Sequence, residues 1–255
     1  MYSWVMVPVF KSTFSIGKSI LTLDEAEKDG GPDSILSICE ENKIKSLVLV
    51  EDSMTGFVTA HNRCKERDIN LVFGLRVTCC NDVNEDDNSD HKIVIFANDD
   101  DGCRLLYRIY SYAYTSNSGK VDFNFLNSLW SDSIDLVIPF YDSFIYNNSL
   151  HLKKCVPSFS KISPVFWVED NCLPFDKLLA RKVKKFADNI GAKCKDVKSI
   201  FYKKREDVEA LQTYKILCNR NFGKAASLSS PNLNHFGSQE FCFESYLEKK
   251  EVANG

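Results

Sequence analysis

The sequence lacks a long hydrophobic run. No stretch of about 18 or more apolar residues occurs, so we expect no membrane-spanning helix and no membrane partner. The first residues lack the basic segment and the cleavage motif of a secretory leader. The cysteines form no C-x-x-C pair, and only Cys79 and Cys80 are close together in the sequence. These absences predict a cytoplasmic protein with reduced, mostly buried thiols.

Common catalytic and metal-binding motifs are missing too. No H-x-H or H-x-x-x-H arrangement indicates a zinc site, and no G-x-S-x-G turn indicates a nucleophilic serine. The segment "FSIGKS" (14–19) resembles the end of a phosphate-binding loop. It lacks the first glycine of that motif at the required spacing, so we interpret the match as coincidence. Short motifs therefore indicate no enzyme class.

Charge is balanced overall but uneven along the chain. The formal net charge of -3 argues against a general attraction to nucleic acid or membranes. Residues 176–205, however, contain eleven Lys or Arg against three Asp. This stretch is either a solvated helix face with its loops or a surface that contacts DNA phosphates without reading bases. The nucleic-acid candidates are Arg181, Lys182, Lys184, Lys185, Lys203, Lys204 and Arg205.

Hydrophobic periodicity predicts alternating strands and helices. Apolar runs such as "SLVLV" (46–50) predict buried strands, whereas apolar residues three and four apart, as in 174–189, predict amphipathic helices. The acidic, Asn-rich segment 81–90 predicts a solvated loop. The expected strands are 4–10, 46–50, 69–80, 92–97, 134–140, 163–169 and about 193–197, and the expected helices are 32–43, 55–68, 100–115, 174–189 and about 204–217.

This alternation predicts an α/β fold in which helices cover a parallel sheet. Six or seven strand–helix units in about 220 residues favour a closed barrel over an open sheet. We expect one domain over residues 1–255, with 220–255 as an extended tail or cap. In such barrels the chemistry lies at the carboxyl ends of the strands. The residues expected at those ends are Lys11, Asp52, Arg76, Asp142, Asp170 and Asp196.

Several segments, taken in order, carry a resemblance to a known family. They are "KSTFSIG" (11–17), "LVLVEDSMTGF" (47–57), "INLVFGLRV" (69–77), "HKIVIFANDDDGCRLLYRIYSYAY" (91–114), "VFWVEDNCLPFDKLLARKVKKFADNIGA" (165–192), "KDVKS" (195–199), "REDVEALQTYKIL" (205–217) and "FGSQEFCFESYLEKKE" (236–251). Together they resemble the PHP (polymerase and histidinol phosphatase) domain that opens the alpha subunit of family C replicative DNA polymerases, DNA polymerase III. The resemblance covers nearly the whole chain and implies a distorted (β/α)7 TIM-like barrel, the PHP fold.

In active PHP domains the resemblance implies a cluster of divalent metals that hydrolyses phosphoesters. Here Asp52 and Asp196 keep the acids of two ligand motifs, and Asp142 aligns uncertainly with a further ligand position. Lys11, Arg76 and Lys198 would instead place cations where metals bind, and cations repel a divalent ion. The vestigial metal-site positions are Val9, Lys11, Asp52, Ser53, Arg76, Asn171, Asp196 and Lys198.

The resemblance therefore implies a catalytically inactive PHP-like domain that acts as a structural and interaction module in bacterial or phage DNA replication. The chain is either the opening part of a longer polymerase or a separately encoded domain, so the polymerase catalytic region is its expected partner in cis or in trans. We expect no catalytic residues and no cofactor, and only weak DNA binding.

Two alternatives stay open. The first is a metal-dependent phosphoesterase or 3′–5′ exonuclease that binds Mn, Zn or Mg through Asp52, Asp196 and Asp142. The second is a divergent protein that binds a small phosphorylated ligand through Lys11, Arg76 and Lys198.

Overall fold

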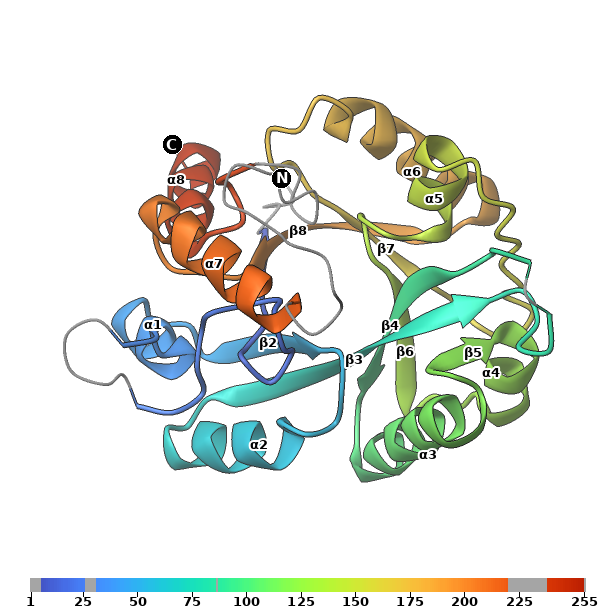
Figure 1. Cartoon of the computed structure of the whole chain (residues 1–255), viewed down its shortest axis with the longest axis horizontal. Coiled ribbons are helices and arrows are strands. Elements are labelled where there is room, and N and C mark those ends of the chain that lie inside the picture. Colours follow the sequence, from blue (N-terminus) through green and yellow to red (C-terminus); the bar gives the residue numbers. More distant parts are fainter. Residues whose placement is uncertain (1–5, 26–30, 86, 220–237, 255) are drawn as a thin grey trace.

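The computed structural model describes residues 6–25, 31–85, 87–219 and 238–254 (Figure 1). Strands and helices alternate along most of this part of the chain. The strands are β1 (Val7–Phe10), β2 (Ser46–Glu51), β3 (Asn70–Cys80), β4 (His91–Ala97), β5 (Lys120–Asp122), β6 (Ile134–Ile138), β7 (Val165–Val168) and β8 (Lys193–Ile200). The helices are α1 (Ile35–Glu41), α2 (Phe57–Glu66), α3 (Asp100–Ser116), α4 (Phe123–Leu129), α5 (Phe144–Leu150), α6 (Asp176–Ile190), the short 3₁₀ helix η1 (Arg205–Asp207), α7 (Val208–Asn219) and α8 (Phe243–Asn254).

The strands close into a barrel, as the sequence predicts. Among the described residues the ring runs β1, β2, β3, β4, β6, β7 and β8, and β8 pairs with β1 to complete it. β5 stays outside the ring, because it pairs only with the last residues of β3. A closed ring leaves no unpaired strand edge, so the backbone hydrogen bonds of each barrel strand are shared with two neighbours.

The expectation of a wholly parallel sheet is wrong, because β4 runs antiparallel to both β3 and β6. The reason is the connection between β3 and β4, which consists only of residues 81–90. A parallel pair needs a crossover of about a dozen residues or more, usually a helix, whereas an antiparallel pair can be joined by a short loop. The acidic segment 81–90, described except for residue 86, is a loop as predicted.

The barrel is filled by β-branched and aromatic side chains. One buried cluster consists of Val9, Val50, Val94, Phe96, Val137, Trp167 and Val197. These seven residues come from six strands of the ring, and the two from β4, Val94 and Phe96, are two positions apart and so point to the same face. This cluster is therefore the barrel interior. A larger cluster lies between the strands and the helices, which surround the barrel in Figure 1.

Three short elements escaped the sequence prediction. β5, α4 and α5 have three, seven and seven residues, too few for a strong periodic signal. Local hydrogen bonds mark the two helix starts. The Asp122 carboxylate accepts from the Phe125 N–H at 2.8 Å, and the Ser143 hydroxyl accepts from the Tyr146 N–H at 3.3 Å. Both are N-cap bonds, which stabilise a helix start by about 1 kcal/mol.

The described C-terminal region, 238–254, is helical from residue 243 onward. Within the expected tail or cap 220–255, residues 220–237 and 255 lie outside the described residues, and Phe243–Asn254 form α8. α8 lies beside α7 near β8 (Figure 1), and Arg205 links it to the preceding segment through Glu248, 2.6 Å away. No helix of the described chain is long and apolar enough to cross a membrane.

Candidate functional site

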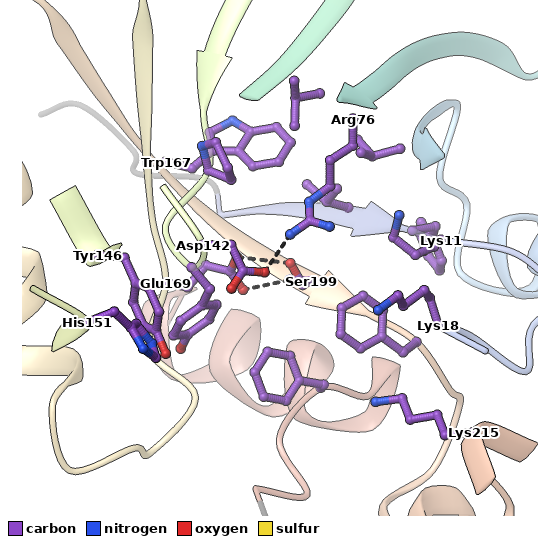
Figure 2. Close-up of a pocket in the computed structure, with 18 residues that line it drawn as sticks. Lys11, Lys18, Arg76, Asp142, Tyr146, His151, Trp167, Glu169, Ser199 and Lys215 are labelled. Atoms are coloured by element: carbon purple, nitrogen blue, oxygen red, sulfur yellow. Dashed lines mark hydrogen bonds and ion pairs between the residues drawn. The ribbon is translucent and has the colours of Figure 1, made fainter. Parts of the chain in front are cut away.

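A cavity of about 380 Å³ opens at the end of the barrel where the parallel strands have their carboxyl ends. Its floor is the apolar barrel interior, and its walls come from the strand ends and from the segments that follow them (Figure 2). This is the end of the barrel at which the sequence analysis placed the chemistry. The cavity is lined by Val9, Phe10, Lys11, Lys18, Val50, Arg76, Val94, Pro139, Tyr141, Asp142, Tyr146, His151, Trp167, Glu169, Ser199, Phe201, Lys215 and Phe241.

Two of the cations at this mouth are paired with carboxylates. The Lys11 ammonium lies 3.1 Å from the Asp52 carboxylate, and the Arg76 guanidinium lies 3.5 Å from the same group. Arg76 also reaches Asp142 at 2.6 Å, as Figure 2 shows. Lys11, Asp52, Arg76 and Asp142 therefore converge as the sequence suggested, in a chain of alternating charges. We call these four residues the paired cluster.

The electrostatics of the paired cluster favour the charged carboxylate. Burial alone would raise the pKa of Asp52, but the charges of Lys11 and Arg76 outweigh burial and hold this pKa well below its usual range. The pKa of Lys11 is lowered, chiefly by burial, with the Asp52 charge opposing the shift. Asp52 is thus ionised at neutral pH and already neutralised by two protein cations.

Glu51, the neighbouring acid, does not face the cavity but binds Ser12 and Ser15 in the loop after β1. Its side chain is completely buried, and one carboxylate oxygen accepts from the Ser12 N–H at 2.9 Å and from the Ser12 hydroxyl at 2.6 Å. The other oxygen accepts from the Ser15 hydroxyl, which in turn accepts from the Asp52 N–H at 2.9 Å. Burial is the main cause that raises the pKa of Glu51. Glu51 therefore fixes the loop after β1 and the backbone of Asp52.

Glu169 follows β7 and forms the opposite wall of the cavity. Its carboxylate accepts from the Ser199 N–H at 3.0 Å and hydroxyl at 2.9 Å, and from the Asn171 amide at 3.1 Å. Burial is the largest influence on its pKa and raises it, while these hydrogen bonds act in the opposite direction. The sequence analysis missed this residue, because it placed the strand end at Asp170 and because the family resemblance pointed to Asn171.

Asp196 and Lys198 do not join the paired cluster, in contrast to the expectation. β8 continues to Ile200, so its last inward-facing residues are Val197 and Ser199, whereas side chains at alternate positions face outward. Lys198 is fully buried on that outer face and donates to the Asn171 side-chain oxygen at 2.6 Å. Asp196 lies earlier in the strand and lines a separate groove. The strand end had been placed too early in the sequence.

The remaining predicted positions divide between the floor and the rim. Val9 is buried in the cavity floor, where its aliphatic side chain offers no ligand atom. Ser53 is outside the cavity lining, and its hydroxyl donates to Thr55 at 3.1 Å. Asp170 is exposed, and Lys249 donates to its backbone carbonyl.

The donor set does not fit a divalent metal. Within the described ranges, no three His, Cys, Asp or Glu side chains come together in a way that could hold a metal ion. The carboxylates of the paired cluster already face Lys11 and Arg76, whose positive charges oppose a second cation at the same oxygens.

Two further lysines, which the sequence analysis did not select, line the cavity. Lys18 lies in the loop after β1, within the segment that resembles part of a phosphate-binding loop, and it is exposed. Lys215 comes from α7 and is only 3 % exposed. A single lysine in the apolar stretch "YKILC" gives no signal in the sequence, because helical lysines are usually solvated.

The basic candidates fall into two groups. The first group projects from α6 into solvent and has no carboxylate partner in the described part of the chain. It consists of Arg181, Lys182, Lys184 and Lys185.

The second group is neutralised by carboxylates. Lys203 lies 3.5 Å from Asp33, Lys204 lies 3.2 Å from Glu206, and Arg205 lies 3.1 Å from Glu240.

No family model matches the chain, and no curated protein matches it.

Proposed function

We propose that the chain is a catalytically inactive PHP-like domain that serves as a structural and interaction module of a family C replicative DNA polymerase, DNA polymerase III. Its fold would be the distorted (β/α)7 TIM-like barrel of that family. The closed barrel supports this fold assignment, and the antiparallel strand β4 is a departure from a regular (β/α) barrel of the kind that a distorted barrel would have. The ordered sequence segments that resemble the family carry the assignment to the polymerase.

One observation supports the proposed lack of activity: Lys11 and Arg76 form ion pairs with Asp52 at the mouth of the barrel. A phosphoesterase of this family needs acids and histidines that bind metals and activate water. In this chain the acid is engaged by protein cations, which neutralise it without a metal. The domain would therefore keep the barrel for its shape and its surfaces, while the polymerase chemistry resides elsewhere, in cis or in trans.

DNA would be a weak, secondary partner. The unpaired basic residues of α6 offer attraction to the phosphate backbone, and phosphate contacts alone do not read sequence. Affinity would depend mainly on the protein partner.

Two experiments test this proposal. Purification of the full chain from its native source should recover a family C polymerase polypeptide, joined to it or bound to it, identified by mass spectrometry. Absence of any such polypeptide would overturn the interaction role. A phosphodiesterase and 3′–5′ exonuclease assay with Mn²⁺, Zn²⁺ or Mg²⁺ should show no turnover. Turnover that Asp52→Asn abolishes would overturn the inactive state and establish the nuclease alternative.

A further inference from the structure

The solvent face of α6 carries an excess of positive charge. The helix contains five Lys or Arg and two Asp. Asp176 is buried and accepts from the N–H groups of Asn171 and Leu173 at 2.8 and 3.1 Å, so Asp188 is the one acid that α6 exposes. The four cations of the first basic group have no carboxylate partner within the described residues. This face therefore attracts a negatively charged partner.

Exposed leucines lie beside these charges. Leu178 is 50 % exposed and lies one turn before Lys182 on the same side of α6. The Lys182 ammonium donates to the Ser149 hydroxyl at 3.0 Å, which joins the solvent faces of α5 and α6 (Figure 1). Leu150 follows Ser149 directly and is 39 % exposed, and Leu152 is 86 % exposed. Exposed apolar residues that gather in one place, rather than singly, are typical of an interaction site.

Leu178 and three of the cations form one stripe on α6. Their spacing of i, i+3, i+4 and i+7 places them on one side of the helix, and the stripe consists of Leu178, Arg181, Lys182 and Lys185. The opposite side of α6 is buried in the fold through Leu179, Val183 and Ala187. The stripe therefore faces away from the barrel. We call this stripe together with Leu150 and Leu152 the α5–α6 face.

The mixture of basic and apolar side chains fits an acidic protein segment better than DNA or a membrane. Contacts to DNA phosphates use charged and polar groups, which leave exposed leucines without a partner. A membrane surface binds a helix through a continuous apolar face, and the apolar face of α6 is already buried in the fold. A protein segment with carboxylates beside apolar side chains complements both parts of the α5–α6 face.

We propose that the α5–α6 face docks an acidic protein segment, whose carboxylates pair with the cations of α6 and whose apolar side chains cover the exposed leucines. This inference rests on the proposed interaction role and deepens it, because it names the surface and the chemistry of the partner. The complementary charges accelerate the encounter, and the burial of the leucines slows dissociation.

Photo-crosslinking tests which molecule covers the face. The full chain is produced in its native source with p-benzoylphenylalanine in place of Leu178, irradiated and analysed by mass spectrometry. The crosslinked protein segment should contain more Asp and Glu than Lys and Arg, with apolar residues among them. The matched control carries the same group in place of Val58, an exposed apolar residue of α2, and should not crosslink to that segment. No protein crosslink at position 178, a neutral or basic segment, or the same segment from both positions would overturn the docking surface.

A designed peptide measures the charged and the apolar contributions separately. The probe is a fluorescein-labelled peptide of about 15 residues with Leu at positions i, i+3, i+4 and i+7 and Glu elsewhere. Fluorescence anisotropy at low salt should show saturable binding to the full chain. Lys182→Glu combined with Lys185→Glu should weaken the affinity about tenfold or more, and Leu178→Ser about fivefold. Lys65→Met, which removes an exposed lysine of α2 that no carboxylate of the described chain engages, should leave the affinity unchanged.

Two further ligands test the other possible occupants. Duplex DNA and vesicles of phosphatidylserine and phosphatidylcholine should bind more weakly than the peptide, and Leu178→Ser should leave the affinity for duplex DNA unchanged. Tighter binding of the duplex or of the vesicles would overturn the proposal in favour of that ligand. Wild-type affinity for the peptide in Leu178→Ser or in the double charge reversal would also overturn it.

The crosslinking result keeps this inference distinct from the proposed function. An acidic segment at position 178 that belongs to no family C polymerase or polypeptide bound to one would support the docking surface and contradict the polymerase role. A family C polymerase that copurifies with the chain, with no acidic segment crosslinked at position 178, would support the polymerase role and overturn the docking surface.

Discussion

Two pairs of cations at the cavity differ in how their charges are compensated. Lys11 and Arg76 form ion pairs with the carboxylates of Asp52 and Asp142. Lys18 and Lys215 form no ion pair with a described carboxylate, although the charge of Lys18 contributes to the low pKa of Asp52. Lys215 is buried, and the like charge of Lys18 acts on it. The first pair therefore stabilises the fold, whereas the burial of the Lys215 ammonium opposes folding.

The largest effect should come from breaking the paired cluster. Asp52→Asn should lower the free energy of unfolding by about 3 kcal/mol at pH 7, because it leaves Lys11 and Arg76 without their shared partner in a partly buried site. Urea unfolding followed by circular dichroism measures this. Asp132→Asn, at an exposed position, is the matched control and should change the free energy by less than about 0.5 kcal/mol.

The loss in Asp52→Asn should depend on pH in one direction. The pKa of Asp52 is held below its usual range in the folded state, so its stabilisation is present above the unfolded-state pKa of about 4. This stabilisation is lost as the pH falls below that value toward the folded-state pKa. The difference between wild type and variant should therefore shrink below pH about 4. A difference that grows in acid would contradict the ion pairs.

Replacing the buried Lys215 should raise the stability of the fold, in contrast to Asp52→Asn. Lys215→Met should raise the free energy of unfolding by about 2 kcal/mol at pH 6, because a buried ammonium without a partner is replaced by an apolar side chain of similar length. Urea unfolding of the variant and of the Lys65→Met control measures the gain. A loss of stability in Lys215→Met at pH 6 would show that the ammonium has a partner after all.

The pH profile of Lys215→Met sharpens this prediction. Burial lowers the pKa of Lys215 from 10.5 to about 7 on folding, with Lys18 as the facing charge that contributes. The penalty is fully present below pH 7, where both states carry the proton, and is relieved as the pH rises from about 7 to 10.5. The gain in the variant should therefore be smaller at pH 9.5 than at pH 6. Equal gains at both values would mean that Lys215 titrates normally.

A smaller effect is expected at the outer end of the paired cluster. The Asp142 side chain is 53 % exposed, so its ion pair with Arg76 is screened by solvent. Asp142→Asn should lower the free energy of unfolding by less than about 1 kcal/mol. A loss as large as that of Asp52→Asn in the same urea titration would show that the two carboxylates contribute equally.

The smallest effect concerns DNA. Neutralising Arg181, Lys182, Lys184 and Lys185 together should weaken duplex binding about equally for all sequences and reduce its salt dependence. Neutralising Lys203, Lys204 and Arg205 should have little effect, because carboxylates already engage them. Fluorescence anisotropy with two unrelated duplexes distinguishes the groups. A larger loss in the second set would reverse their assignment.

Sequence patterns predicted the barrel but not its details. Apolar strand runs recur wherever a strand is buried, so most strands were found close to their observed bounds. The direction of β4 was missed because hydrophobic patterns do not encode strand direction. The one sequence feature that indicates an antiparallel strand is the shortness of the loop 81–90, which cannot hold a crossover helix. The short helices α4 and α5 depend on caps and tertiary packing, which a periodicity count does not register.

The site was only partly predictable for a related reason. Lys11, Asp52 and Arg76 were found because they end or interrupt strands at the mouth of the barrel. Lys198 was assigned to the site by the family resemblance, but it occupies a position of β8 that alternates with the inward-facing Val197 and Ser199. Lys215 was missed because its burial depends on where α7 packs against the barrel, and that information is spread over the whole chain.

The central claim is that Lys11 and Arg76 neutralise the Asp52 carboxylate at the mouth of the barrel, where they oppose the binding of a divalent metal. Calorimetric titration of the purified full chain with Mn²⁺, together with its metal content by elemental analysis, tests this most directly. We predict no stoichiometric metal and no saturable binding at micromolar Mn²⁺. One or more tightly bound metal ions per chain, lost on Asp52→Asn, would contradict the account.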